Sequence, residues 1–109
     1  MTDTAHSFQV GDFLSETLVT DTQVWEVIET TAKTVTVRDT RRVEGVIQSP
    51  SPMIVRYAVE PDPGGKAVVR RVRKDGTVRI ENWSRPLRPS KPIQFEEGEY
   101  HYEEVDWSF

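Results

Sequence analysis

β-Branched residues dominate the apolar part of this sequence. Val, Ile and Thr number 31 of the 109 residues, whereas Leu, Ala and Met together number nine. β-Branched side chains lose rotamer freedom in helices and pack well on pleated sheets. Seven prolines and six glycines interrupt the chain at short intervals. We therefore predict an all-β domain of short antiparallel strands.

Alternation of apolar and polar residues locates several of these strands. Residues 23–30 and 33–39 alternate on either side of Thr31-Ala32 and predict a hairpin, with Val35 and Val37 pointing inward. Residues 53–59 predict a further strand. Residues 40–52 end in Ser-Pro-Ser-Pro, a sequence that favours unpaired backbone, and we expect them to be irregular.

A second hairpin is expected from Lys66 to Trp83, and two registers compete for it. A two-residue Asp75-Gly76 loop would mix arginines with apolar residues on both faces. A three-residue loop that ends at Gly76 pairs Arg73 with Thr77 and separates the faces, so we prefer it. It places Val68, Val72, Val78 and Ile80 on one face, and Arg71, Arg73, Arg79 and Trp83 on the other.

Three stretches resemble small SH3-like β-barrel proteins of bacteriophages and other mobile elements. They are Val10-Gly11-Asp12-Phe13, VWEVIE at 24–29 and KTVTVRD at 33–39, so the likeness covers roughly residues 8–40. The functions of those proteins are mostly unassigned. The resemblance implies a small, partly open SH3-like barrel of five to seven strands and a phage-type setting, but no activity.

The expected organisation is a single barrel with two different ends. We predict a disordered N-terminal lead over residues 1–7, a β-barrel domain over 8–95, and an acidic, aromatic strand or tail over 96–109. The chain has no cysteine, which excludes disulfides and cysteine-based metal sites. Residues 1–7 lack the apolar core of a signal peptide, so a cytoplasmic location is expected, inside the host cell if the protein is phage-encoded.

The net charge of −4 conceals a strong segregation of charge. Residues 1–32 hold six acids and no Lys or Arg, and residues 92–109 do the same. Residues 33–91 hold all 14 basic residues against six acids. Nine of those basic residues, with only two acids, lie in residues 66–91, which we call the basic segment.

The basic segment is a candidate for contact with nucleic acid. Phosphate backbones attract such clusters, and an aromatic ring among them can stack on an unpaired base. The structural alternative is that the arginines cover an exposed face while Trp83 caps the core. The candidate nucleic-acid-binding residues are Lys66, Arg71, Arg73, Lys74, Arg79, Trp83, Arg85 and Arg88.

The C-terminus is a candidate for docking a partner. Its acids followed by a terminal Phe resemble the acidic tip of single-stranded-DNA-binding proteins, which docks partner proteins and competes with DNA for the basic groove. The structural alternative is a final strand with two tyrosines on one face. The candidate partner-binding residues are Tyr100, Tyr102, Glu103, Glu104, Asp106, Trp107 and Phe109.

These patterns lead to two functional hypotheses. The first is a non-enzymatic phage-type protein that binds nucleic acid through the basic segment, with the C-terminus modulating binding or docking a partner. The alternative is a protein-interaction module, such as a virion adaptor or an inhibitor of a host protein, without nucleic-acid binding. No catalytic pairing, metal-ligand spacing or phosphate loop is recognisable, so we expect no enzyme activity, cofactor or metal.

Overall fold

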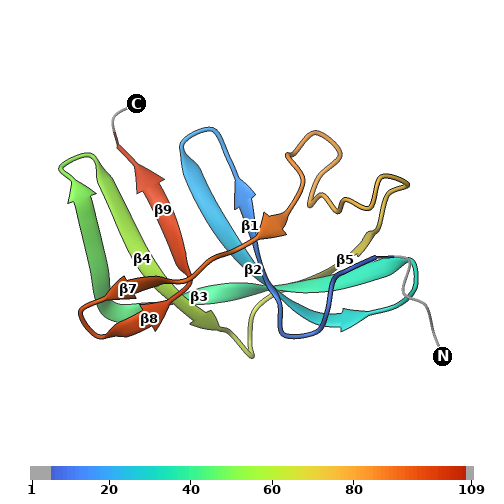
Figure 1. Ribbon diagram of the computed structural model, residues 1–109, viewed down its shortest axis with the longest axis horizontal. Coiled ribbons are helices and arrows are strands. Elements are labelled where there is room, and N and C mark those ends of the chain that lie inside the picture. The colour runs from blue at the N-terminus through green and yellow to red at the C-terminus, as the bar shows by residue number, and fades with distance from the viewer. Residues whose placement is uncertain (1–5, 108–109) are drawn as a thin grey trace.

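The computed structural model describes residues 6–107, and over that range the chain forms nine β-strands and no helix (Figure 1). No helix of these residues is therefore long and apolar enough to cross a membrane. The all-β prediction is confirmed. The strands are β1 (Phe13–Thr17), β2 (Asp21–Thr30), β3 (Thr34–Ser51), β4 (Ile54–Pro61), β5 (Ala67–Arg71), β6 (Arg88–Pro89), β7 (Ile93–Phe95), β8 (Gly98–Tyr100) and β9 (Tyr102–Asp106).

Seven strands form one antiparallel sheet in the order β5-β3-β4-β9-β2-β1-β6. An additional pairing between β2 and β3 closes β2, β3, β4 and β9 into a ring. Strand β5 extends the ring on one side, while β1 and β6 extend it on the other. The expected partly open barrel is thus confirmed, and β7 and β8 add a separate two-stranded hairpin.

The long strand β3 corrects the expectation that residues 40–52 are irregular. Its first half pairs with β2 and β5, and its second half pairs with β4. A register shift between Arg42 and Ile47 lets the strand continue, with Gly45 at a φ of 78° inside the bulge. Pro50 and Pro52 fall at the end of the β3–β4 hairpin, where missing N–H donors do not interrupt the ladder.

The larger of two hydrophobic clusters lies under the basic segment. Val27, Val35 and Val37 of β2 and β3 are fully buried, as the alternation predicted for the last two. Residues after β5 complete this core, because Val78, Ile80 and Leu87 are buried in the same cluster. The segment between β5 and β6 therefore covers the core from one open edge of the sheet to the other (Figure 1).

The smaller cluster lies at the other end of the molecule. Val46, Ala58 and Phe95 are buried there, and Tyr100 and Tyr102 pack against them. Phe95 and Tyr100 come from the β7–β8 hairpin, so this hairpin covers β3 and β4 as the basic segment covers β2 and β3.

The prediction of a hairpin over Lys66–Trp83 is confirmed at the turn but is wrong for the second strand. Arg73 N donates to Thr77 O at 2.9 Å, and Gly76 has a φ of 84°, as the three-residue loop requires. Residues 77–83 form no strand, and the chain turns at Glu81–Ser84, where Ser84 Oγ bonds both the N–H and the C=O of Glu81. The apolar side chains of this stretch still point inward, as the preferred register predicted.

The two ends of the described chain are integrated into the fold. His6 is 9% exposed, and its Nε2 lies 2.7 Å from Thr31 O, so the expected disordered lead is wrong at this residue. Residues 1–5 and 108–109 lie outside the described residues. Strand β9 lies between β4 and β2, so the acidic C-terminal segment is part of the barrel up to Asp106.

Substitution of Leu87 tests whether the basic segment covers the larger hydrophobic cluster. The Leu87→Ala variant should lose about 2–4 kcal/mol of unfolding free energy in urea denaturation, because Leu87 is 4% exposed and truncation leaves a cavity. Val19→Ala is the control, since Val19 is 89% exposed, and it should change stability by less than about 0.5 kcal/mol. Equal effects of the two variants would show that residues 72–91 do not close the core.

Candidate nucleic-acid interface

The salt bridges of the described residues all lie outside the basic segment. Four are present, and their cations are Arg38, Arg41, Arg42 and Arg56. None of the nine Lys and Arg residues of the basic segment forms a salt bridge with a described carboxylate. The seven exposed members of this set are therefore available to a partner, whereas Arg70 and Arg79 are half-buried and bond backbone carbonyls.

The acids of β9 are held by arginines of β3 and β4. Glu103 Oε1 accepts from Arg42 Nε at 2.9 Å, and Glu104 Oε1 accepts from Arg56 Nε at 3.0 Å. Arg56 lies directly opposite Glu104 in the β4–β9 ladder, so register alone brings this pair together. Arg42 also lies 3.8 Å over the ring of Tyr57. Glu103 and Glu104 thus pair with Arg42 and Arg56 and not with the arginines of the basic segment.

Most of the predicted nucleic-acid-binding residues are exposed. Lys66, Arg71, Arg73, Lys74, Trp83, Arg85 and Arg88 all lie on the surface. Arg79 differs, because it is half-buried and its Nη1 donates to Ser84 O. Arg79 therefore holds the segment in place, and the prediction that it shares an exposed face with Arg71 and Arg73 is wrong.

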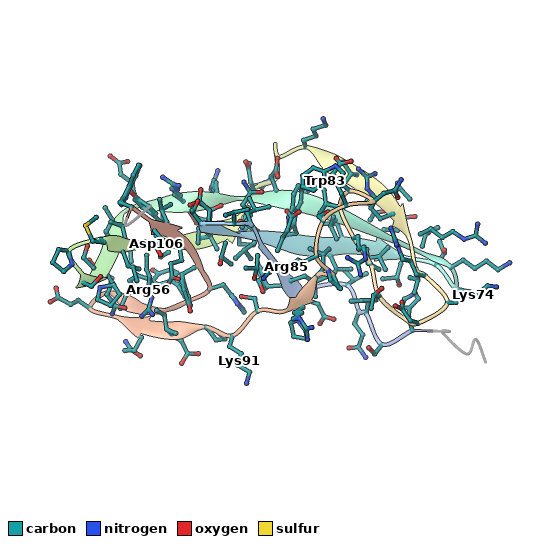
Figure 2. All side chains as sticks on the ribbon, turned by 90° about the horizontal axis from the view of Figure 1, so that it is seen from above. Arg56, Lys74, Trp83, Arg85, Lys91 and Asp106 are labelled. Carbon is teal, nitrogen blue, oxygen red and sulfur yellow. The ribbon has the colours of Figure 1, made fainter. Side chains whose placement is uncertain are left out.

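The exposed residues do not form one flat face. In Figure 2, Lys74 lies at one end of the long axis, Arg85 near the middle, and Trp83 and Lys91 at opposite edges. Arg56 and Asp106 lie in the other half of the molecule. The labelled residues of the basic segment thus extend from one end of the molecule past its middle, and a strand in contact with several of its cations would follow a curved path.

Trp83 is the only aromatic residue of the basic segment. It is 80% exposed and shares a cavity of about 210 Å³ with the side chain of Arg85. Leu18 and Val19, from the turn between β1 and β2, also line this cavity. An indole beside a guanidinium and an apolar wall suits a planar ring attached to a phosphate.

The predicted partner-binding residues of the C-terminus are mostly held inside the sheet. Tyr100 and Tyr102 pack against the smaller cluster, Glu103 and Glu104 are paired, and Asp106 is half-buried at the end of β9. Trp107 is 61% exposed and borders a cavity of about 480 Å³ beside Val19 and Asp21. Phe109 lies outside the described residues.

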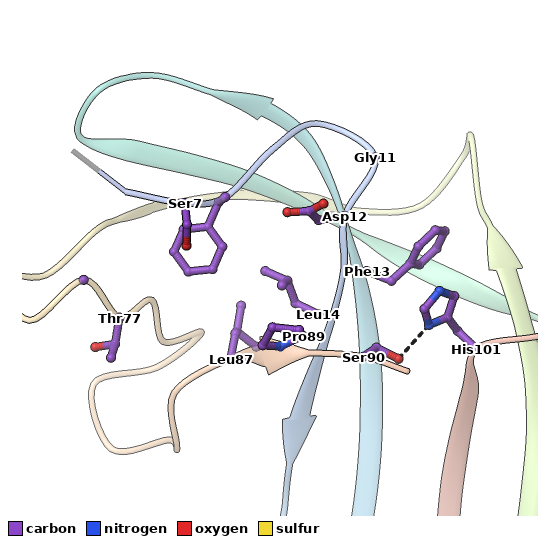
Figure 3. A pocket seen from close by; sticks show the side chains of 12 residues that line it. Ser7, Gly11, Asp12, Phe13, Leu14, Thr77, Leu87, Pro89, Ser90 and His101 are labelled. Atoms are coloured by element: carbon purple, nitrogen blue, oxygen red, sulfur yellow. Dashed lines mark hydrogen bonds between the residues drawn. The ribbon is translucent and has the colours of Figure 1, made fainter. Parts of the chain in front are cut away.

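A further cavity of about 440 Å³, which we call the β1 cavity, lies beside β1 (Figure 3). No pattern in the sequence marked it, because its walls come from segments far apart in the chain. It is lined by Ser7, Phe8, Gly11, Asp12, Phe13, Leu14, Gly76, Thr77, Leu87, Pro89, Ser90 and His101.

His101 fastens the basic segment to the C-terminal strands at the rim of this cavity. Its Nδ1 lies 2.8 Å from Ser90 Oγ, and its ring stacks on Phe13 with centroids 4.4 Å apart (Figure 3). The N–H of Ser90 donates to Phe13 O at 2.8 Å, so it is not free to stabilise an oxyanion. We interpret the Ser90–His101 contact as structural. No group of three or more potential ligands within residues 6–107 is placed to hold a metal ion.

Comparison with protein-family models, curated proteins and solved structures finds no match to this chain. The resemblance of residues 8–40 to phage SH3-like barrels therefore stays a prediction.

The packing of His101 predicts a pH dependence of stability. Burial lowers the pKa of His101 below its ordinary value of 6.5, and the nearby carboxylate of Glu99 opposes this shift. The unfolded chain then binds a proton more readily than the folded protein. The contribution of His101 to the free energy of unfolding is therefore fully present above pH 6.5 and declines as the pH falls toward the folded pKa.

An NMR titration of the imidazole protons checks this expectation. His101 should titrate below 6.5 in the folded protein, and the His101→Asn variant should lose the corresponding slope of unfolding free energy against pH. Titration of His101 at or above 6.5 would contradict the burial of its ring against Phe13.

Proposed function

We propose that this chain is a non-enzymatic nucleic-acid-binding protein in which the basic segment contacts phosphates. The observation that carries the proposal is the separation of charge described above. None of the nine Lys and Arg residues of this segment forms a salt bridge with a described carboxylate, while Glu103 and Glu104 of β9 pair with Arg42 and Arg56. A stretch of unpaired cations on a curved surface is what a phosphate backbone requires of a sequence-independent partner.

The exposed side chain of Trp83 favours a single-stranded nucleic acid over a duplex as the ligand. Its exposed indole, with Arg85 beside it, offers a stacking surface that paired bases inside a duplex cannot reach. Base stacking is tolerant of sequence, because every base has a π face. The proposed ligand is therefore single-stranded DNA or RNA.

The proposal assigns the acidic C-terminus a structural part. Competition of this segment with nucleic acid would require its carboxylates to reach the basic segment, whereas Glu103 and Glu104 are held at Arg42 and Arg56. Removal of residues 96–109 would also remove β8 and β9, and with them the closed ring. Point substitutions are thus the appropriate test. A phage-type setting belongs to the proposal through the resemblance alone, and a location inside the cell through the lack of an apolar signal core in residues 1–7.

Docking of a protein partner is the second candidate function. The observation that favours it is the exposed ring of Trp107 beside Val19, at a cavity that also includes Asp21. Aromatic residues in such settings often carry much of the energy of an interface. A partner whose binding survives high salt and is lost in Trp107→Ala would support this function over the first.

The salt dependence of binding tests the proposed function. The full-length protein should bind a labelled dT12 oligonucleotide at low salt, with an affinity that falls steeply as salt increases. The triple variant Arg71→Ala/Arg73→Ala/Lys74→Ala should bind more weakly, and its salt slope should decrease by about 0.7 for each phosphate contact removed. Anisotropy of the labelled oligonucleotide gives both quantities.

The matched control is Arg41→Ala/Arg42→Ala. These two arginines are equally exposed but are paired with Glu60 and Glu103, so their removal should leave the salt slope almost unchanged. Absence of binding by the wild-type protein at low salt would refute the proposal. An equal loss in both variants would mean that the basic segment is not the site.

A further inference from the structure

The β1 cavity combines apolar walls with one carboxylate. Figure 3 shows Asp12 and Leu14 on the same side of β1, facing Thr77, Leu87 and Pro89, while Phe13 and His101 lie on the other side. This division follows from the alternation of side chains along a strand. The volume of about 440 Å³ is within the range of pockets that enclose small molecules.

The basic segment forms a large part of this cavity. Gly76, Thr77, Leu87, Pro89 and Ser90 all line it. Exposed cations lie close to these residues in the chain: Lys74 is two residues before Gly76, with Asp75 between them, and Arg88 and Lys91 adjoin Leu87, Pro89 and Ser90. A strand bound by the basic segment would therefore run close to this cavity.

Asp12 is placed to accept a hydrogen bond from a ligand. Its Oδ2 accepts from the N–H of Gln9 at 2.9 Å, which fixes the carboxylate beside the turn at Gly11. No hydrogen bond to its other oxygen is present among the described residues. A carboxylate oxygen in a partly apolar cavity prefers an N–H donor, such as the exocyclic amine of a base.

We propose that the β1 cavity receives one unpaired nucleobase of the strand held by the basic segment, and that Asp12 accepts from its exocyclic amine. This inference rests on the proposed function. Phe8 contributes an aromatic wall to the cavity, and Leu14 and Leu87 contribute apolar surface. Cytosine and adenine carry an exocyclic amine, whereas thymine has none and offers a carboxylate only its ring N3–H, which is flanked by two carbonyl oxygens that repel the carboxylate.

The inference predicts a base preference that depends on Asp12. Labelled dC12 and dA12 should bind the full-length protein about three- to tenfold more tightly than dT12, the effect expected of one hydrogen bond. Asp12→Asn keeps an oxygen for the N–H of Gln9 but replaces the free oxygen with an amide donor. This variant should lose the preference or reverse it in favour of dT12.

Two matched variants separate this effect from general changes in affinity. Asp62 caps the N–H of Gly64 at 3.0 Å in an exposed turn, as Asp12 caps that of Gln9, so Asp62→Asn should keep the preference. Trp83→Ala should weaken binding of the three oligonucleotides by similar factors, because stacking is tolerant of sequence. The methyl resonances of Leu14 and Leu87 should shift when dC12 is added, owing to the ring current of the bound base.

The outcomes distinguish this inference from the function on which it rests. Failure of the wild-type protein to bind any of the oligonucleotides at low salt would overturn the proposed function. Salt-dependent binding with equal affinity for the three sequences, unchanged in Asp12→Asn, would overturn only the inference. Unshifted Leu14 and Leu87 methyl resonances at saturation with dC12 would likewise overturn it.

Discussion

The pairing of β9 with both β2 and β4 is the contact on which the rest of the structure depends. It closes the ring of the barrel with the most acidic strand of the chain. It also brings Glu103 and Glu104 to Arg42 and Arg56. Those pairs neutralise two of the three carboxylates of β9, and Arg56 lies in the half of the molecule remote from Lys74. The open charge of the basic segment is therefore a consequence of strand order.

The basic segment both covers part of the core and exposes most of its charged side chains. It must cover the larger hydrophobic cluster, which it does with Val78, Ile80 and Leu87. Its charged residues must then point outward, because burial of an unpaired guanidinium is costly. Arg79 shows the limit of this arrangement, since it is half-buried and bonds the carbonyl of Ser84. The same stretch that completes the core thus presents the cations proposed to contact nucleic acid.

Composition and short sequence patterns predicted the features that depend on neighbouring residues in the chain. Residue composition predicted the all-β class, alternation predicted the burial of Val35 and Val37, and Asp75-Gly76 predicted the turn that joins Arg73 to Thr77. The passage of β3 through residues 40–51 was missed, because a bulge at Gly45 keeps the strand continuous where the prolines suggested a break.

Contacts between distant segments were beyond the reach of such patterns. The position of β9 depends on pairing with strands about 50 and 80 residues away, and nothing in its own sequence specifies those partners. The β1 cavity has the same origin, since Asp12, Thr77 and His101 meet only in the folded chain. The nucleic-acid-binding residues could be named from charge alone, but the structural part of Arg79 and the pairing of Glu103 could not.

The central claim is that pairing within the barrel leaves the basic segment open to a nucleic-acid strand. A titration of the isotope-labelled full-length protein with dT12, followed by backbone amide chemical shifts, tests it most directly. We predict that the largest shifts fall in residues 71–91, while the amides of Arg42, Arg56 and residues 102–106 change little. Largest shifts along β9 and its partners on β3 and β4, or no shift at saturating oligonucleotide and low salt, would contradict the claim.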